Sequence, residues 1–217
     1  MHHIEIDRTT GQLALHTANT SYIMQVREGF LLHLYWGRKT LGDSTYMFRT
    51  QGRAAFSPCM EHCEGFILDD VPLEYPCWGR GDMRTPALEV INPDGSDIID
   101  LRVKKYDVIE GKPSLPGLPA AYATAEHGCE TLVVTLADDI SNITVELYYC
   151  VFASLDVITR YARIINNGST QARIEAAASA SVDFDNVNYD VISNFGTHCR
   201  ERNIERAPLA HGRYIMS

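Results

Sequence analysis

Carboxylates are the side chains in this sequence whose types and spacing come nearest to catalytic chemistry. Asp183 and Asp185 stand two residues apart in an alternating stretch, so on a strand both would point to the same face. Two carboxylates facing one bond are what glycoside hydrolysis requires. Acidic side chains on protein surfaces are, however, usually solvated and unpaired. We therefore expect Asp183 and Asp185 to be solvated rather than catalytic.

The segment Cys59–Cys63, with the sequence CMEHC, resembles half of a metal site. A structural zinc site takes four ligands, normally from two such segments, and no second one follows. The sequence also contains no glycine-rich phosphate loop after a strand, no nucleophile elbow and no H-E-x-x-H motif. We therefore expect no bound metal, no cofactor and no catalytic residue in this chain.

Composition limits the classes of protein to which the chain can belong. Its 217 residues are 45% hydrophobic and 22% charged, which predicts a folded domain with a sizeable core. A net charge of −9 without a cluster of basic residues argues against nucleic acid as a partner. The chain has no apolar run long enough to span a membrane and no secretory signal at its start. A chain of this length does not need disulfides, so we expect six reduced cysteines and a cytoplasmic location.

Alternation of apolar and polar residues dominates the sequence and predicts an all-β fold. Two stretches do not alternate, residues 42–90 and the proline-containing residues 110–121, and both are expected to be long loops with functional or interfacial roles. Many strands without helices indicate a sandwich or a barrel. The expected strands are 12–16, 21–27, 30–36, 98–108, 131–136, 143–151, 157–166 and 171–184.

The positions of two tryptophans and one pair of charged residues each predict a role for the side chain. Trp36 continues an expected strand and should lie in the core, whereas Trp78 lies in a loop and could contact a partner or a sugar. Asp82 and Arg84 are separated by one residue and could pair with each other or with a partner domain. Both readings of the Asp82–Arg84 pair stay open from the sequence.

Six motifs in a fixed order resemble a known family. Together they resemble the N-terminal domain of bacterial glycoside hydrolase family 36 α-galactosidases, and the resemblance covers nearly the whole chain. The motifs are HLYWGRK (33–39), EYPCWGRGDMRTPAL (74–88), GKPSLPGLPAAY (111–122), LYYCVFASLDVITRYARIINNG (147–168), SASVDFDNVNYDVISNFG (179–196) and CRERNIERAPL (199–209).

The resemblance implies an antiparallel two-sheet β-supersandwich similar to galactose mutarotase. In the family this domain precedes a (β/α)8 barrel, which carries both catalytic aspartates and a motif similar to K-W-D-x-N. No such motif occurs here, so residues 1–217 are expected to be the N-terminal sandwich without its barrel, incomplete at the C-terminal end and inactive alone. The full enzyme would be a retaining hydrolase of terminal α-galactosides such as raffinose or melibiose.

The resemblance also implies substrate-binding positions and partners. The family usually has a tryptophan before its R-E-R motif, where this chain has His198, and an aspartate before an R-x-x-F-S-P-like segment, where it has Gly52 or Arg53. We expect His198, Gly52, Arg53 and Trp78 to be candidates for sugar contact, with altered specificity because an imidazole offers a smaller apolar face than an indole. The expected partners are an α-galactoside, the catalytic barrel and further copies of the chain.

Arg200 and Arg202 flank Glu201 on an expected extended segment, so both arginines should face the same side. Arginine can hold a carboxylate through two parallel hydrogen bonds, which would suit docking onto the acidic mouth of a barrel. The alternative is a solvated edge strand protected from aggregation by its charges.

Two other functions compete with the domain of an α-galactosidase. One is a stand-alone carbohydrate-binding module, which would need a platform of exposed aromatic side chains. The other is an enzyme of the mutarotase kind that uses histidine and glutamate as acid and base. His33, His62, His127 and His198 are scattered without a glutamate at strand spacing, so this alternative has the least support.

Overall fold

The computed structural model describes residues 3–50, 59–60, 63, 66–184 and 188–210, and these residues form strands, loops and three single 3₁₀ turns. The 3₁₀ turns are η1 (Thr45–Met47), η2 (Leu68–Asp70) and η3 (Ala153–Leu155). The chain divides into two units, Met1–Val182 and Asp183–Ser217, and each is described by itself. No helix in the described residues is long and apolar enough to cross a membrane.

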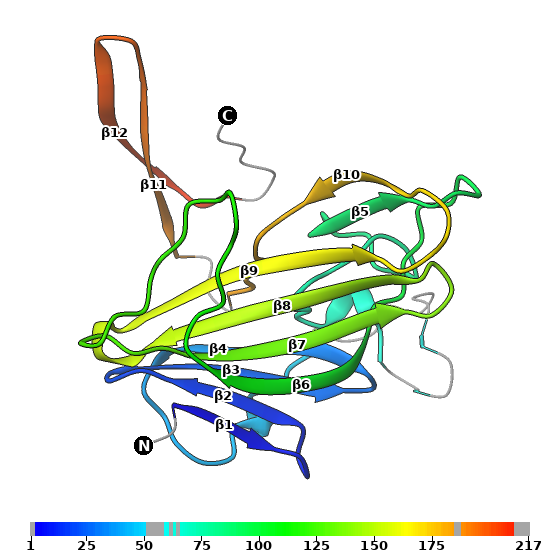
Figure 1. Cartoon of the computed structure of the whole chain (residues 1–217), viewed down its shortest axis with the longest axis horizontal. Helices are drawn as coiled ribbons and strands as arrows, with labels where there is room; N and C mark the ends of the chain where they lie inside the picture. The colour runs from blue at the N-terminus through cyan, green and yellow to red at the C-terminus, as the bar shows by residue number, and fades with distance from the viewer. Residues whose placement is uncertain (1–2, 51–58, 61–62, 64–65, 185–187, 211–217) are drawn as a thin grey trace. The chain divides into compact units, whose positions relative to one another are not determined.

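The first sheet is an antiparallel meander at the N-terminus. Its order is β1-β2-β3-β4 (Figure 1), with the bounds β1 (Ile4–Asp7), β2 (Gln12–His16), β3 (Thr20–Arg27) and β4 (Phe30–Arg38). Glu28 and Gly29 join β3 to β4 with φ angles of 51° and 78°. Two positive φ values suit the tight hairpin turn whose twist matches the flanking strands. Local backbone geometry therefore fixes the register between β3 and β4.

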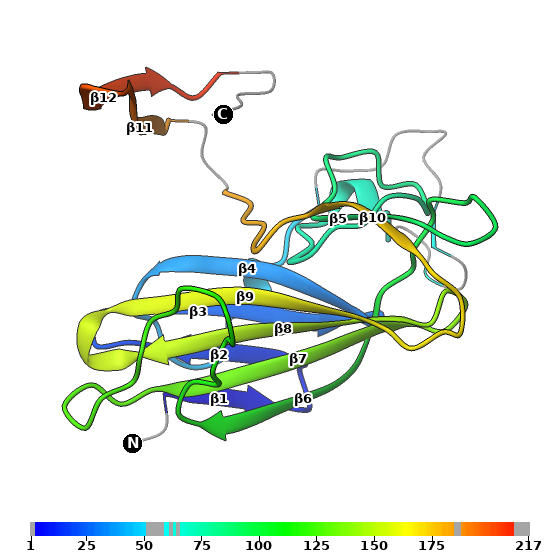
Figure 2. The ribbon, with the colours of Figure 1, turned by 45° about the horizontal axis from the view of Figure 1, so that its top comes forward.

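The second sheet is another antiparallel meander, in the order β6-β7-β8-β9. Figure 2 shows that it packs face to face with the first sheet. A small third sheet pairs β5 with β10, with a register shift between Ile174 and Ala176. The bounds are β5 (Leu88–Ile91), β6 (Arg102–Glu110), β7 (Glu130–Asp138), β8 (Ile143–Phe152), β9 (Val157–Asn166) and β10 (Arg173–Ala177).

The core fills the space between the two four-stranded sheets. Every second residue of the central strands points inward, as the period of a strand requires. These side chains belong to one continuous apolar cluster, which is the main source of stability for the unit. They include Leu13, Leu15 and Met24 from the first sheet and Leu132, Val134, Leu136, Val145 and Leu147 from the second.

The second unit contains one antiparallel hairpin, which we call the arm: β11 (Asp190–Thr197) and β12 (Arg200–Pro208). Nearly all of its side chains are exposed, including those of Ile192, Phe195 and Ile204. An isolated two-stranded hairpin is at best marginally stable in water. None of the arm's residues belongs to a buried apolar cluster, so within the described residues the arm has no hydrophobic core of its own.

The structure confirms the predicted all-β, antiparallel two-sheet class, and most of the expected strands agree with it. The strand predicted at 98–108 begins later, at Arg102, and the one predicted at 171–184 is limited to β10. The strands β1, β5 and β11 were not among the expected strands, and of β12 only residues 200–202 were expected to be extended. The loops predicted at 42–90 and 110–121 agree with the structure except at their edges: residues 88–90 belong to β5 and residue 110 to β6, and the other described residues of both stretches lie in no strand.

The prediction that Trp36 lies in the core is wrong, because its side chain is 52% exposed. Trp36 pairs with Tyr22 across β3 and β4, and their ring centroids are 6.2 Å apart. Strand β4 is the edge of its sheet, so it has a neighbouring strand on one side only. The alternation of the sequence shows which residues share a face but not where the sheet ends.

Candidate functional site

A network of polar side chains lies buried between the two sheets, centred on Glu74. Glu74 has 0% exposure and comes from the loop between β4 and β5. Its Oε1 accepts hydrogen bonds from Tyr22 Oη at 2.5 Å and His33 Nδ1 at 2.9 Å. Its Oε2 accepts hydrogen bonds from Tyr149 Oη and Arg160 Nη2, both at 2.7 Å. One loop carboxylate thus connects strands β3, β4, β8 and β9.

The electrostatics of the network favour one arrangement of charges. Burial alone raises the pKa of Glu74, but the charge of Arg160 and the hydrogen bonds from His33 and Tyr22 lower it below its usual value. Burial and the neighbouring carboxylate raise the pKa values of Tyr22 and Tyr149. Burial lowers the pKa of Arg160, but Glu74 and the two tyrosines raise it overall. Glu74 is therefore ionised, Arg160 is charged and both tyrosines are neutral donors.

The network contains the histidine–glutamate pair that the spacing of the sequence did not reveal. His33 and Glu74 are 41 residues apart, and Glu74 lies outside any strand, so strand spacing gave no signal. A general acid or base must, however, reach the substrate. Glu74 is fully buried and Arg160 is the fourth partner of its carboxylate, with a side chain only 12% exposed. This pair is therefore closed to a sugar, and it gives no support to a mutarotase-like mechanism.

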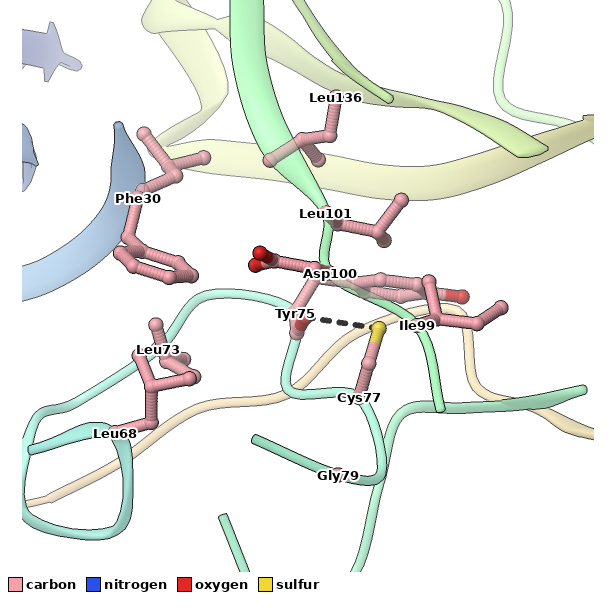
Figure 3. A pocket seen from close by; sticks show the side chains of 11 residues that line it. Phe30, Leu68, Leu73, Tyr75, Cys77, Gly79, Ile99, Asp100, Leu101 and Leu136 are labelled. Atoms are coloured by element: carbon pink, nitrogen blue, oxygen red, sulfur yellow. Dashed lines mark hydrogen bonds between the residues drawn. The ribbon is translucent and has the colours of Figure 1, made fainter. Parts of the chain in front are cut away.

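A partly open pocket in the first unit, shown in Figure 3, is too small for a sugar. It measures about 20 Å³, has mostly apolar walls that include Phe30 and Leu101, and contains the thiol of Cys77, 3.7 Å from the carbonyl oxygen of Tyr75. Burial raises the pKa of the Cys77 thiol, so it is neutral. Pockets for small molecules measure several hundred cubic ångströms, whereas about 20 Å³ holds one water.

Two of the four predicted sugar-contacting residues lie within the described residues, Trp78 in the first unit and His198 in the second. His198 is exposed at the turn of the arm, between β11 and β12. Trp78 is half-buried in the first unit, where its carbonyl accepts a hydrogen bond from the N–H of Ile99 at 3.3 Å. Gly52 and Arg53 lie outside the described residues. Sugar contact by these four residues stays a prediction.

Asp82 and Arg84 pair with each other. Asp82 is 1% exposed, and Arg84 donates to both of its carboxylate oxygens at 3.0 Å through Nε and Nη2. Arg84 Nη2 also donates to the carbonyl of Leu68 at 2.9 Å. The two parallel bonds are the strongest form of this contact. Of the two alternatives, the loop-stabilising salt bridge is present in the structure.

The arm does not place Arg200 and Arg202 on one regular face as predicted. The register shifts between Phe195 and Thr197, and Arg202 has a φ of 62°. An extra residue in one strand interrupts the alternation of side chains. The prediction assumed an unbroken strand, which this bulge removes.

The acidic pair and the Cys59–Cys63 segment gain no support as sites. Asp183 lies outside any strand, and Asp185 falls outside the described residues, as do Glu61 and His62. Cys59 and Cys63 are free thiols, like the other four cysteines. In the described part of the chain, no group of three or more histidine, cysteine or acidic side chains is arranged to hold a metal.

The profile of the glycosyl hydrolase family 36 N-terminal domain matches residues 29–217. The chain belongs to this family. The family 36 domain is 43% identical over 203 residues to "Bifunctional alpha-galactosidase/sucrose kinase AgaSK" of Mediterraneibacter gnavus, covering 91% of this chain and 21% of that protein. It is 40% identical over 205 residues to "Alpha-galactosidase AgaA" of Geobacillus stearothermophilus, covering 94% and 28%.

Solved structures agree with this assignment of the family 36 domain. The galactosidase domain of AgaSK matches with a TM-score of 0.90 at 41% identity, covering 96% of this chain and 29% of that one. The α-galactosidase AgaB of Geobacillus stearothermophilus also matches with a TM-score of 0.90, at 38% identity and the same coverage. The chain spans less than a third of the length of these relatives. Because the matching profile is that of the family's N-terminal domain, the chain corresponds to that domain.

Proposed function

We propose that this domain supports, without catalysing, the hydrolysis of terminal α-galactosides by an enzyme that includes a catalytic barrel. The observation that carries the proposal is the family 36 match over residues 29–217, together with relatives that are α-galactosidases of more than three times this length. A raffinose complex of a variant of AgaA, 40% identical to this chain, favours raffinose-type sugars as substrates.

The sandwich would pack against the barrel, and the arm would help to cover the sugar pocket or to join copies of the enzyme. Support comes from the apolar side chains that the arm exposes: Ile192 at 64%, Phe195 at 52% and Ile204 at 74%. Apolar groups gathered on an exposed element are typical of surfaces that bind another protein or domain. Within the described residues the arm has no core that would account for them.

His198 at the turn of the arm is the residue that we expect to approach the sugar. An imidazole can donate or accept a hydrogen bond, so it suits sugar hydroxyls. Gly52, Arg53 and Trp78 remain further candidates. The cytoplasmic location is also part of this proposal.

The test compares this chain alone with the protein encoded by its complete gene. We expect the 217-residue chain to release no galactose from a chromogenic α-galactoside and the complete protein to release it. Replacement of His198 by alanine in the complete protein should raise KM for raffinose, whereas His127→Ala, at a half-buried loop position outside the arm, should not. Turnover by the isolated chain, or none by the complete protein, would overturn the proposal.

Fluorescence separates this proposal from a stand-alone binding module. Trp36 and Trp78 are the two tryptophans of the chain, and both are at least partly exposed. Titration of the isolated chain with raffinose should give no saturable change in their emission. A saturable change would favour a carbohydrate-binding module instead.

A further inference from the structure

The chain between β10 and the second unit is tied to the sandwich by hydrogen bonds at both of its ends. We call residues 178–181 the root segment. The N–H of Ala178 donates to the carbonyl of Ala87 at 2.7 Å, and the carbonyl of Ala178 accepts from Tyr75 Oη at 2.9 Å. The carbonyl of Ser181 accepts from Arg160 Nη1 at 3.0 Å. All of these contacts lie inside the first unit.

The root segment has little else to hold it. Residues 178–180 are exposed, Ser181 is half-buried, and the segment belongs to no strand. It therefore lacks both the ladder of backbone hydrogen bonds and the apolar burial that keep a strand in place. Two of its three tethers come from side chains, those of Tyr75 and Arg160.

One tethering side chain, that of Arg160, bonds to the buried carboxylate, and the other belongs to the residue that follows Glu74 in the chain. Glu74 and Tyr75 are neighbours in the EYP motif, and Glu74 Oε2 holds Arg160 Nη2 at 2.7 Å. The other terminal nitrogen of the same guanidinium, Nη1, donates to Tyr22 Oη at 2.8 Å and to the carbonyl of Ser181. The planar fork of arginine can bind both groups at once, which the single ammonium of lysine does less well.

Burying the charges of Glu74 and Arg160 carries a desolvation cost, which indicates that the network does more than stabilise the core. Apolar side chains of similar volume often replace a buried ion pair with no loss of stability. Apolar side chains could not, however, hold the carbonyl oxygens of Ala178 and Ser181. The contacts that apolar side chains cannot replace include those to the root segment.

We propose that Glu74, Tyr75 and Arg160 are positioning residues that fix the root segment, so that the chain leading to the arm starts from a defined point. The anchoring is a property of the first unit alone. Its benefit for sugar binding rests on the proposed function, in which the arm and His198 help to cover the substrate.

Hydrogen exchange on the 217-residue chain tests the anchoring. Tyr75→Phe removes one hydroxyl and should speed exchange of the Ala178 amide, the root N–H that donates to the carbonyl of Ala87, about fivefold, the effect of losing one ordinary hydrogen bond. Exchange in β8 should not change. Arg160→Lys keeps a cation beside Glu74 but loses the fork that holds the Ser181 carbonyl, and it should also speed exchange of the Ala178 amide.

The control is Tyr148→Phe, which also removes a hydroxyl from a tyrosine. Tyr148 Oη donates to Glu146 Oε2 at 2.8 Å, away from the root segment, so root exchange should stay as in the parent chain. Unchanged root exchange in a folded Tyr75→Phe chain would overturn the proposal. If Arg160→Lys fails to fold, Tyr75→Phe still decides, because it leaves the ion pair intact.

Kinetics of the complete protein separate this inference from the proposed function. Tyr75→Phe should raise KM for raffinose several-fold and leave kcat nearly unchanged. Faster root exchange with an unchanged KM would support the anchoring and overturn its role in substrate binding. Absence of any galactosidase activity in the parent protein would instead overturn the proposed function and leave the anchoring result intact.

Discussion

The sandwich and the arm differ in how far their charged and apolar side chains are buried. In the sandwich, Glu74 is fully buried and Leu132 is 0% exposed, each surrounded by partners from several strands. In the arm, Asp190 and Arg206 form an ion pair at the surface, and Ile204 is 74% exposed. The sandwich pairs Glu74 and covers Leu132 with its own side chains, whereas the arm presents side chains that another surface would have to cover.

This difference separates the part of the domain that determines stability from the part that we expect to contact other molecules. Burial makes a contact strong and its loss costly, while exposure leaves a side chain free to bind a partner. Changes of the same chemical kind should therefore have very different effects in the two regions.

The largest expected effect follows replacement of the buried carboxylate. Glu74→Gln leaves Arg160 buried without its countercharge, so we expect the free energy of unfolding at pH 7 to fall by about 3–5 kcal/mol. Chemical denaturation followed by circular dichroism measures it. The matched control is Glu146→Gln, which breaks a more exposed pair with Arg163 and should cost less than about 1 kcal/mol. Equal losses in both variants would contradict the comparison.

A core truncation should come next in size. Leu132→Ala removes a fully buried side chain from β7 and should lower the free energy of unfolding by about 2–5 kcal/mol, because the cavity is only partly refilled. The same denaturation experiment applies. A loss below about 1 kcal/mol would show that the packing between the sheets is looser than the structure indicates.

A smaller effect should come from the titration of His16 in β2. Its Nδ1 lies 2.8 Å from Ser21 Oγ, and its Nε2 has no hydrogen-bond partner in the described part of the chain. Burial lowers the pKa of His16 below 6.5, with Glu5 acting in the opposite direction. The unfolded chain then binds the proton more readily, so this contribution to stability is complete above pH 6.5 and is lost as the pH falls towards the lower, folded-state pKa.

His16→Asn should therefore flatten the dependence of the melting temperature on pH below 6.5. Glu5→Gln removes the carboxylate 3.8 Å from Nε2, so it should make that dependence steeper. Parallel curves for the parent chain and His16→Asn between pH 5 and 7 would rule out this contribution.

The smallest effect on stability should come from the arm. Ile204→Ala truncates an aliphatic side chain as Leu132→Ala does, but at an exposed position, so the free energy of unfolding should change by no more than about 0.5 kcal/mol. If the arm binds a second copy or the barrel, the same variant should weaken that association in sedimentation experiments. A loss of stability as large as that of Leu132→Ala would show that the arm is part of the folded core.

Much of the fold could be predicted from residue patterns, and the reasons are local. Alternation predicted β2, β3, β4, β7, β8 and β9 because successive side chains of a strand point to opposite faces. Short or exposed strands such as β1 and β11 carry a weak pattern and were missed. Trp36 was placed in the core because alternation cannot show that β4 is an edge strand.

The site was less predictable than the fold. The motifs showed the family, but the network around Glu74 joins residues 41, 52, 75 and 86 positions away in the chain. Glu74 lies at the start of one of the family motifs, but the motif gave no sign of its role or its partners.

The sequence by itself determined the all-β class, the family and the absence of the family's barrel motif, because periodicity and short motifs depend only on residues that are close together in the chain. The tertiary structure decided which charges meet, which tryptophan is covered and where the root segment is held. Those outcomes depend on how two sheets pack face to face, and packing brings together groups whose distance along the chain carries no signal.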